Sequence, residues 1–129
     1  MAVTDLSLLG YLHDSTVLEI KYDFSQRARR VVSFRIICHE ESGYEAWSGK
    51  KINIALKDVI ILNQTTYGAV IGREEINSWK STVTLAVEQE VLRLEKAGIN
   101  CSGIRFLVTF HSGSHLEGIC REINLDVLD

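Results

Sequence analysis

The four histidines of this chain are the side chains with the widest chemical range, because imidazole binds metals and exchanges protons near neutral pH. His111 and His115 flank a Ser-Gly-Ser turn. His13 precedes the first expected strand, and His39 follows the second. If the strand ends meet, three of these rings can approach one another beside a cysteine, a ligand set that zinc accepts. Their spacing is not that of a metal-binding motif, so we expect surface or capping histidines, no metal site and no cofactor.

The cysteines and serines do not form a recognisable nucleophile. Cys38 and Cys120 fall on predicted apolar faces, where a free cysteine behaves as a small hydrophobic side chain. Cys101 follows the expected helix at its C-terminus, the wrong end to activate a thiol. The Ser-Gly-Ser turn lacks the strand-turn-helix setting of a nucleophile elbow. We therefore predict no catalytic residues, and the sequence favours a non-enzymatic protein without excluding an enzyme.

A tryptophan and two acidic pairs are the other side chains with a potential binding role. Trp47 lies with Tyr44 in a long loop, where it can anchor a partner protein, since binding hot spots favour Trp, Tyr and Arg. The alternative is that Trp47 folds back to cover a sheet edge. Glu40-Glu41 and Glu74-Glu75 are interpreted as solvated loop ends, because adjacent residues rarely face one pocket.

Length, charge and hydropathy set the class of protein. The 129 residues are expected to form one domain, 1–129, without repeats or a proline-rich linker. A net charge of −3 argues against nucleic acid as a partner, since such binders are usually basic. No apolar run reaches the length of a membrane helix, and the first ten residues lack the features of a signal peptide. The three cysteines suit reduced thiols, so we expect a cytoplasmic protein.

Alternating apolar and polar residues predict most of the secondary structure as strands. Leu18, Ile20 and Tyr22, for example, share one face of the first strand. A change of face near Arg121 indicates a bulge in the last strand. The predicted strands are Thr16–Asp23, Arg30–Cys38, Lys50–Leu62, a shorter edge segment Tyr67–Ile71, Gly103–His111 and His115–Leu128.

One segment changes period. From Ser81 to Ala97, apolar residues recur at three- and four-residue steps, which predicts a helix with Asn77 or Ser78 as its cap. A helix with one apolar stripe and strands with one apolar face are best buried against each other. The expected fold class is therefore α+β. It is a curved antiparallel sheet of five or six strands with one long helix on one face, in the order β-β-β-(β)-α-β-β.

The two ends of the chain carry a resemblance. Leu12-His13-Asp14-Ser15, running into a strand that ends at Asp23, is similar to the opening of a loose group of small bacterial β-rich proteins with an LHD(A/S) turn. The segment from Ser112 to Glu122 resembles their closing hairpin strand. Some members resemble immunity proteins that neutralise toxins in bacterial competition systems. The resemblance singles out His13 and Asp14, for which capping of a tight turn is the alternative.

These observations favour a non-enzymatic bacterial protein that binds another protein, as an immunity-type inhibitor does. The acidic balance would steer it toward a basic partner. The alternative is a small-molecule binder or hydrolase with a pocket between sheet and helix, and with His13, Asp14, His111 and His115 near its mouth. A third reading is a homo-oligomer that pairs through the edge segment Tyr67–Ile71.

Overall fold

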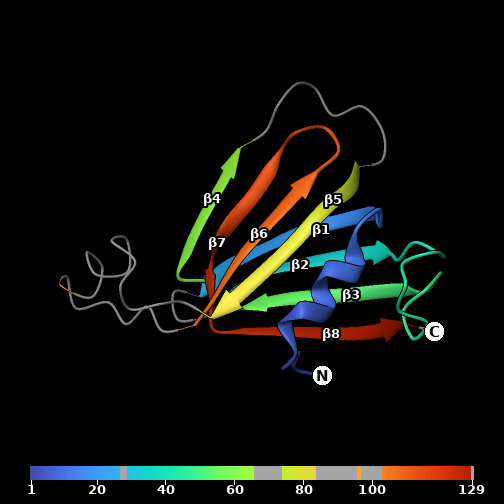
Figure 1. The fold of residues 1–129 in the computed structure, drawn as a ribbon. Coiled ribbons are helices and arrows are strands. Elements are labelled where there is room, and N and C mark those ends of the chain that lie inside the picture. The colour runs from blue at the N-terminus through green and yellow to red at the C-terminus, as the bar shows by residue number, and fades with distance from the viewer. Residues whose placement is uncertain (27–28, 66–73, 84–95, 97–102, 129) are drawn as a thin grey trace.

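Eight antiparallel strands and a short 3-10 helix make up the described part of the chain, in a computed structural model (Figure 1). The structure describes residues 1–26, 29–65, 74–83, 96 and 103–128. The strands lie side by side in the order β4-β7-β6-β5-β1-β2-β3-β8. The elements are η1 (Leu6–Leu12), β1 (Thr16–Gln26), β2 (Arg29–Ile37), β3 (Lys51–Lys57), β4 (Ile61–Thr65), β5 (Glu74–Val83), β6 (Ile104–Phe110), β7 (His115–Cys120) and β8 (Glu122–Leu128).

The expected α+β fold, a five- or six-stranded sheet with one long helix, is wrong. The described residues are mostly β-structure, and their helical element is the seven-residue η1. Ser81–Val83, the first turn of the expected helix, ends strand β5 and pairs with β6. Lys96, the one further residue of that expected helix that the structure describes, is helical; the rest of it lies outside the described residues, as does the expected edge segment Tyr67–Ile71.

A bulge gives the buried side chains of β5 a three-residue spacing. The pairing of β5 with β6 shifts register between Ile76 and Ser78, so one extra residue enters β5. As a result the two buried side chains of this strand, Ile76 and Trp79, are three residues apart instead of two. A three-residue step is what an amphipathic helix shows, and Asn77 and Ser78, the expected helix caps, are strand residues.

The first hairpin follows the predicted alternation, with one exception. Ile20 of β1 lies opposite Phe34 of β2, whose side chain is fully buried. A register shift between Val17 and Glu19 turns Val17 into the core and leaves Leu18 exposed, so the prediction that Leu18 shares the apolar face is wrong. The bulge moves the inward position by one residue.

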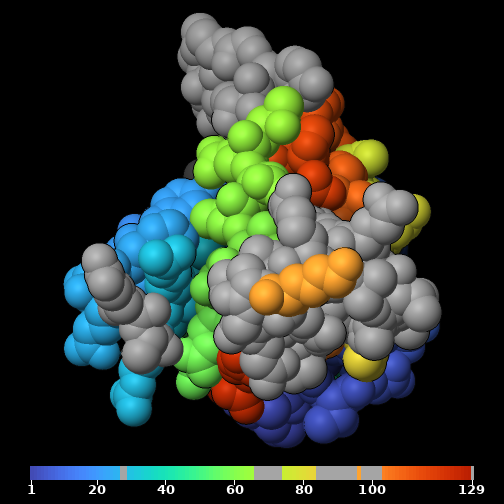
Figure 2. Space-filling model, turned by 90° about the vertical axis from the view of Figure 1, so that its left-hand side faces the viewer, coloured from blue at the N-terminus to red at the C-terminus, as the bar shows by residue number. Residues whose placement is uncertain are grey.

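Two bends let the sheet turn a corner. The expected strand Lys50–Leu62 is divided into β3 and β4 at Asp58, which has a positive φ of 54°. The predicted change of face near Arg121 is confirmed, since it separates β7 from β8. Both bends lie together, because the Arg121 amide donates to the Lys57 carbonyl at 3.0 Å. Figure 2 shows the corner, with the green residues of β3 and β4 beside the blue and cyan β1–β2 hairpin.

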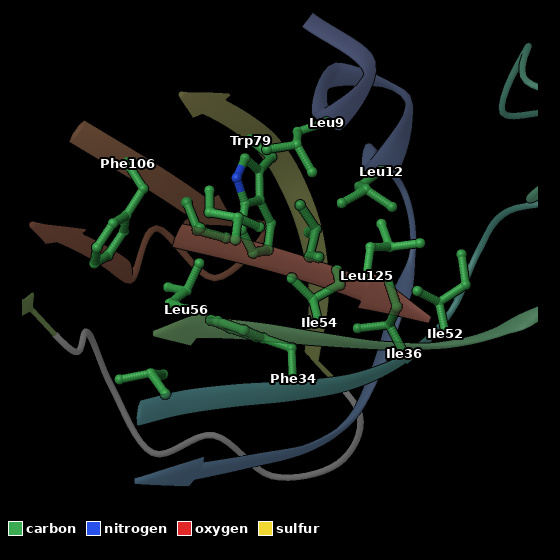
Figure 3. Packing of buried hydrophobic residues seen from close by; sticks show 14 of the residues in the cluster. Leu9, Leu12, Phe34, Ile36, Ile52, Ile54, Leu56, Trp79, Phe106 and Leu125 are labelled. Carbon is green, nitrogen blue, oxygen red and sulfur yellow. The ribbon is translucent and has the colours of Figure 1, made fainter. Parts of the chain in front are cut away.

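The core fills the inside of this folded sheet. Leu9 and Leu12 of η1 are fully buried, and Figure 3 shows them pointing towards side chains of the sheet. The rings of Phe34 and Trp79 meet edge to face with centroids 5.2 Å apart. η1 therefore caps an open side of the core and fixes where the following turn lies. Among the described residues, no helix is long and apolar enough to cross a membrane.

Candidate functional site

The turn after η1 holds two of the predicted site residues, His13 and Asp14. Asp14 adopts a positive φ of 60°, a conformation that aspartate tolerates better than most side chains. Its amide donates to the Ile76 carbonyl at 2.6 Å, and the Ile76 amide donates to the Ser15 carbonyl at 2.9 Å. The turn is thereby tied to the beginning of β5.

The turn brings four side chains together, which we call the acid–histidine cluster: His13, Asp14, Glu75 and His111. His111 follows β6, and its amide donates to the Glu75 carbonyl at 3.0 Å. Its Nε2 lies 3.1 Å from Asp14 Oδ1, and its Nδ1 lies 3.2 Å from Glu75 Oε2. The other Asp14 oxygen lies 3.3 Å from His13 Nδ1. Residues from the η1–β1 turn, β5 and the end of β6 thus share one surface point.

The carboxylates of the cluster face histidine ring nitrogens. The pKa of the Asp14 carboxyl lies below its ordinary value, chiefly because of the hydrogen bond with His13 and against a smaller opposing effect of burial. Both ring nitrogens of His111 face carboxylate oxygens, and a neutral imidazole has only one N–H to donate. The arrangement therefore suits either a doubly protonated His111 or another cation placed between the two carboxylates.

Neighbouring residues hold the β6–β7 turn beside the cluster. The Ser112 hydroxyl donates to Glu74 Oε2 at 2.8 Å, and the Ser112 amide is 3.4 Å from Glu74 Oε1. Gly113, in the middle of the turn, has a positive φ of 90°. Glu74 is therefore engaged in positioning the turn, whereas Glu75 faces His111.

The predicted site residues separate into three places. His13, Asp14 and His111 lie together, so the cluster holds two histidines with carboxylates and not the three histidines beside a cysteine that the strand-end argument expected. His115 does not join them, because it lies opposite Thr65 of β4 and lines a small cavity of about 30 Å³ with Tyr22. Glu75 was interpreted as a solvated loop end, and its role escaped the sequence because β5 was not recognised as a strand.

Trp47 is buried rather than displayed as an anchor. Only 7% of its surface is exposed, and its ring meets that of Tyr44 edge to face at 4.7 Å. Tyr44 in turn stacks on Tyr11, with centroids 5.5 Å apart. The reading in which Trp47 folds back to cover the sheet is the one that agrees with the structure.

The covered tryptophan forms part of a groove that the sequence did not predict. The groove has a volume of about 400 Å³ and lies between the N-terminal segment, η1 and the end of β8. Its lining is mainly apolar and includes Val3, Leu8, Tyr44, Trp47, Leu125 and Val127. Its charged side chains are Asp5 and Asp126, and Asp126 pairs with the Met1 amino group at 2.9 Å.

One edge of β8 borders the groove, and part of this edge forms backbone hydrogen bonds with the N-terminal segment Met1–Val3. The Val3 amide donates to the Ile123 carbonyl at 2.8 Å, and the Leu125 amide donates to the Met1 carbonyl at 2.9 Å. Because backbone groups alternate in direction along a strand, those of Val127 point to the same side, away from β3. The described segment Met1–Val3 pairs with β8 from Ile123 to Leu125.

A polar hollow and two buried thiols are further candidates, and neither has the features of an active site. The hollow, of about 230 Å³, lies on the outer face of β1–β3, where Glu19 is 3.8 Å from Lys21 and 3.7 Å from Arg35. Such exposed ion pairs contribute little energy. Burial raises the pKa of the Cys120 thiol to about 12, so it is a poor nucleophile at neutral pH.

Comparison of this chain with protein-family models, with curated proteins and with solved structures finds no match.

Proposed function

We propose that this protein is a non-enzymatic binding domain that takes an extended segment of another protein into the groove beside β8. The observation that carries the proposal is the apolar groove of about 400 Å³ bordered by an edge of β8 that already accepts the extended segment Met1–Val3. A segment added to this edge gains main-chain hydrogen bonds, and the groove receives its alternate side chains.

The chain's own N-terminal segment supports this choice of occupant. Ala2 forms a β-bridge with Asn124, so the edge of β8 already accepts an extended segment in antiparallel orientation. A partner segment that continues the line of Met1–Val3 would meet the backbone groups of Val127. The groove side chains Leu8 and Trp47 would then contact an apolar residue of that segment.

Charge favours a basic partner. The side chains of Asp5 and Asp126 border the groove, Asp126 in an ion pair with the Met1 amino group, and among the described residues no lysine or arginine side chain lines it. The net charge of the chain is −3. An acidic surface speeds association with a basic protein, as an immunity-type inhibitor of a basic toxin requires. The two described cysteines are free thiols, which supports a place in the reducing bacterial cytoplasm.

The alternative, a small ligand, is favoured by one observation. The groove volume falls in the range of small-molecule pockets, about 300–1,000 Å³. The histidines of that alternative, however, do not line the groove, and the acid–histidine cluster lies on an exposed surface. A hydrolase with a histidine-lined pocket between sheet and helix therefore has less support than a binding domain.

The test is capture of a partner with a matched pair of variants. Val127→Arg places a charged side chain in the lining of the groove, on β8. Val83→Arg, the control, makes the same change at a site that is 68% exposed. The unaltered protein and Val83→Arg should retain the same partner from a bacterial lysate, and Val127→Arg should lose it. Equal retention by both variants would contradict the groove as the binding site.

Nuclear magnetic resonance then separates the two kinds of occupant. A partner segment that pairs with β8 should slow amide exchange at Val127, because its N–H becomes hydrogen-bonded. A small ligand should shift the resonances of Leu8 and Trp47 without protecting that amide. Shifts confined to residues outside the groove would overturn both readings.

A further inference from the structure

Three side chains of the acid–histidine cluster have the geometry of metal ligands. One ligand atom each from Asp14, Glu75 and His111 lies within 4.8 Å of the other two. A metal with bonds of about 2.1 Å holds tetrahedral ligands about 3.4 Å apart. The three side chains are 40–48% exposed, so the carboxylate that faces the other ring nitrogen has room to turn towards the ligating one and close the difference.

The donor set is selective. One imidazole nitrogen with two carboxylates suits zinc and related transition metals, whereas calcium and magnesium prefer oxygen ligands alone. Three protein ligands leave positions for water, as in open zinc sites. In the part of the chain that the structure describes, no lysine or arginine forms an ion pair with Asp14 or Glu75. Two carboxylates and one imidazole nitrogen are therefore available to a divalent ion.

The backbone holds the ligands before any ion arrives. The Asp14 amide donates a hydrogen bond to the Ile76 carbonyl, which fixes the backbone of Asp14. The His111 amide donates a hydrogen bond to the Glu75 carbonyl. His13 contacts the Asp14 oxygen that faces away from His111, which orients the carboxylate from behind. Outer contacts of this kind typically strengthen metal binding by about tenfold or more.

We propose that Asp14, Glu75 and His111 bind one divalent transition-metal ion of the zinc class. The ion lies where one ring nitrogen of His111 and one oxygen each of Asp14 and Glu75 converge. The site joins the η1–β1 turn to β5 and to the end of β6, so a bound ion also links the two parts of the sheet that meet where Thr16 pairs with Glu75. It shares no residue with the lining of the groove beside β8.

Calorimetric titration of the untagged, chelator-treated protein with zinc chloride tests this assignment. We expect one ion per chain, and a loss of affinity of at least about tenfold in His111→Ala and in Asp14→Asn. His39→Gln is the matched control, because His39 is an exposed histidine whose Nδ1 accepts only the Glu41 amide. It should bind zinc as the unaltered protein does.

Two further measurements make the outcome decisive. Cobalt(II) should give visible absorption bands with the unaltered protein and lose them in His111→Ala, and magnesium should not compete. All substituted side chains are exposed, so circular dichroism should show unchanged folding. Absence of saturable zinc binding, or equal zinc affinity in His111→Ala and the unaltered protein, would overturn the proposal.

Discussion

Replacing Gly118 by alanine is the sharpest test of how β4 packs on β7 at one edge of the sheet. Gly118 lies in β7 opposite Leu62 of β4. A Cβ at this position would collide with the carbonyl oxygen of Ile61 and approach Phe106 Cζ to 2.9 Å. The Ile61 carbonyl belongs to the backbone and cannot rotate away as a flexible side chain would. β4 must therefore move relative to β7.

The size of the effect follows from this contact. Overpacking a closely packed region costs about 1–3 kcal/mol, and a rigid backbone neighbour places Gly118→Ala at the upper end. A loss of about 3 kcal/mol lowers the melting temperature by roughly 10 °C in a domain of this length. Urea unfolding followed by the fluorescence of the two buried tryptophans, Trp47 and Trp79, measures it directly.

Gly10→Ala is the control. No heavy atom lies within 4 Å of a Cβ built on Gly10, and its φ is not in the left-handed region. Its stability should stay within about 1 kcal/mol of the unaltered protein, on the stable side, because alanine reduces the entropy of the unfolded chain. If Gly118→Ala and Gly10→Ala unfold at the same urea concentration, β4 does not pack on β7 as described.

Three further predictions concern the core and single side chains. Leu12→Ala should lower the unfolding free energy by about 2–5 kcal/mol, measured by urea titration, because Leu12 is fully buried beneath the open side of the sheet. Cys120, with its pKa raised to about 12 chiefly by burial, should resist iodoacetamide at pH 8 in the folded protein and react after unfolding, as mass spectrometry would show. The hydrogen bond from the Ser25 hydroxyl lowers the pKa of Asp23 below 3.8, so the stability it gives is present above that pH and lost as the pH falls through the lower folded value. Ser25→Ala should return the pKa of Asp23 towards 3.8 in a carboxyl carbon-13 titration, and an unchanged pKa would assign the shift to another cause.

Strands could be predicted from the sequence wherever side chains alternate without interruption. Val32, Phe34 and Ile36 of β2 are all buried, as the pattern predicts. The change of face near Arg121 was equally visible, because apolar residues mark both sides of it. The prediction failed at Ser81–Val83, which were assigned to a helix from the apolar steps of Ser81 to Ala97 but pair with β6, because pairing with a distant strand overrides a local helical period.

The candidate site was partly predictable for a related reason. His13, Asp14 and His111 stand at strand ends, and strand ends meet at the edges of an antiparallel sheet. Glu75 became a member only through the pairing of β5 with β1, which single-sequence patterns do not reveal. The groove was hidden as well, because its walls come from the N-terminal segment, the loop containing Trp47 and the last strand.

The helix η1 ties the groove to the acid–histidine cluster. Leu8 on η1 lines the groove, Leu9 and Leu12 anchor η1 in the core, and the turn at its end positions Asp14. Asp5 starts the helix by accepting the Ser7 amide at 3.1 Å, and it also borders the groove. A shift of η1 would therefore move a groove wall and a cluster ligand together. Any free energy that links the two sites must be reciprocal, so a segment bound in the groove and an ion held by Asp14 would strengthen or weaken each other to the same extent.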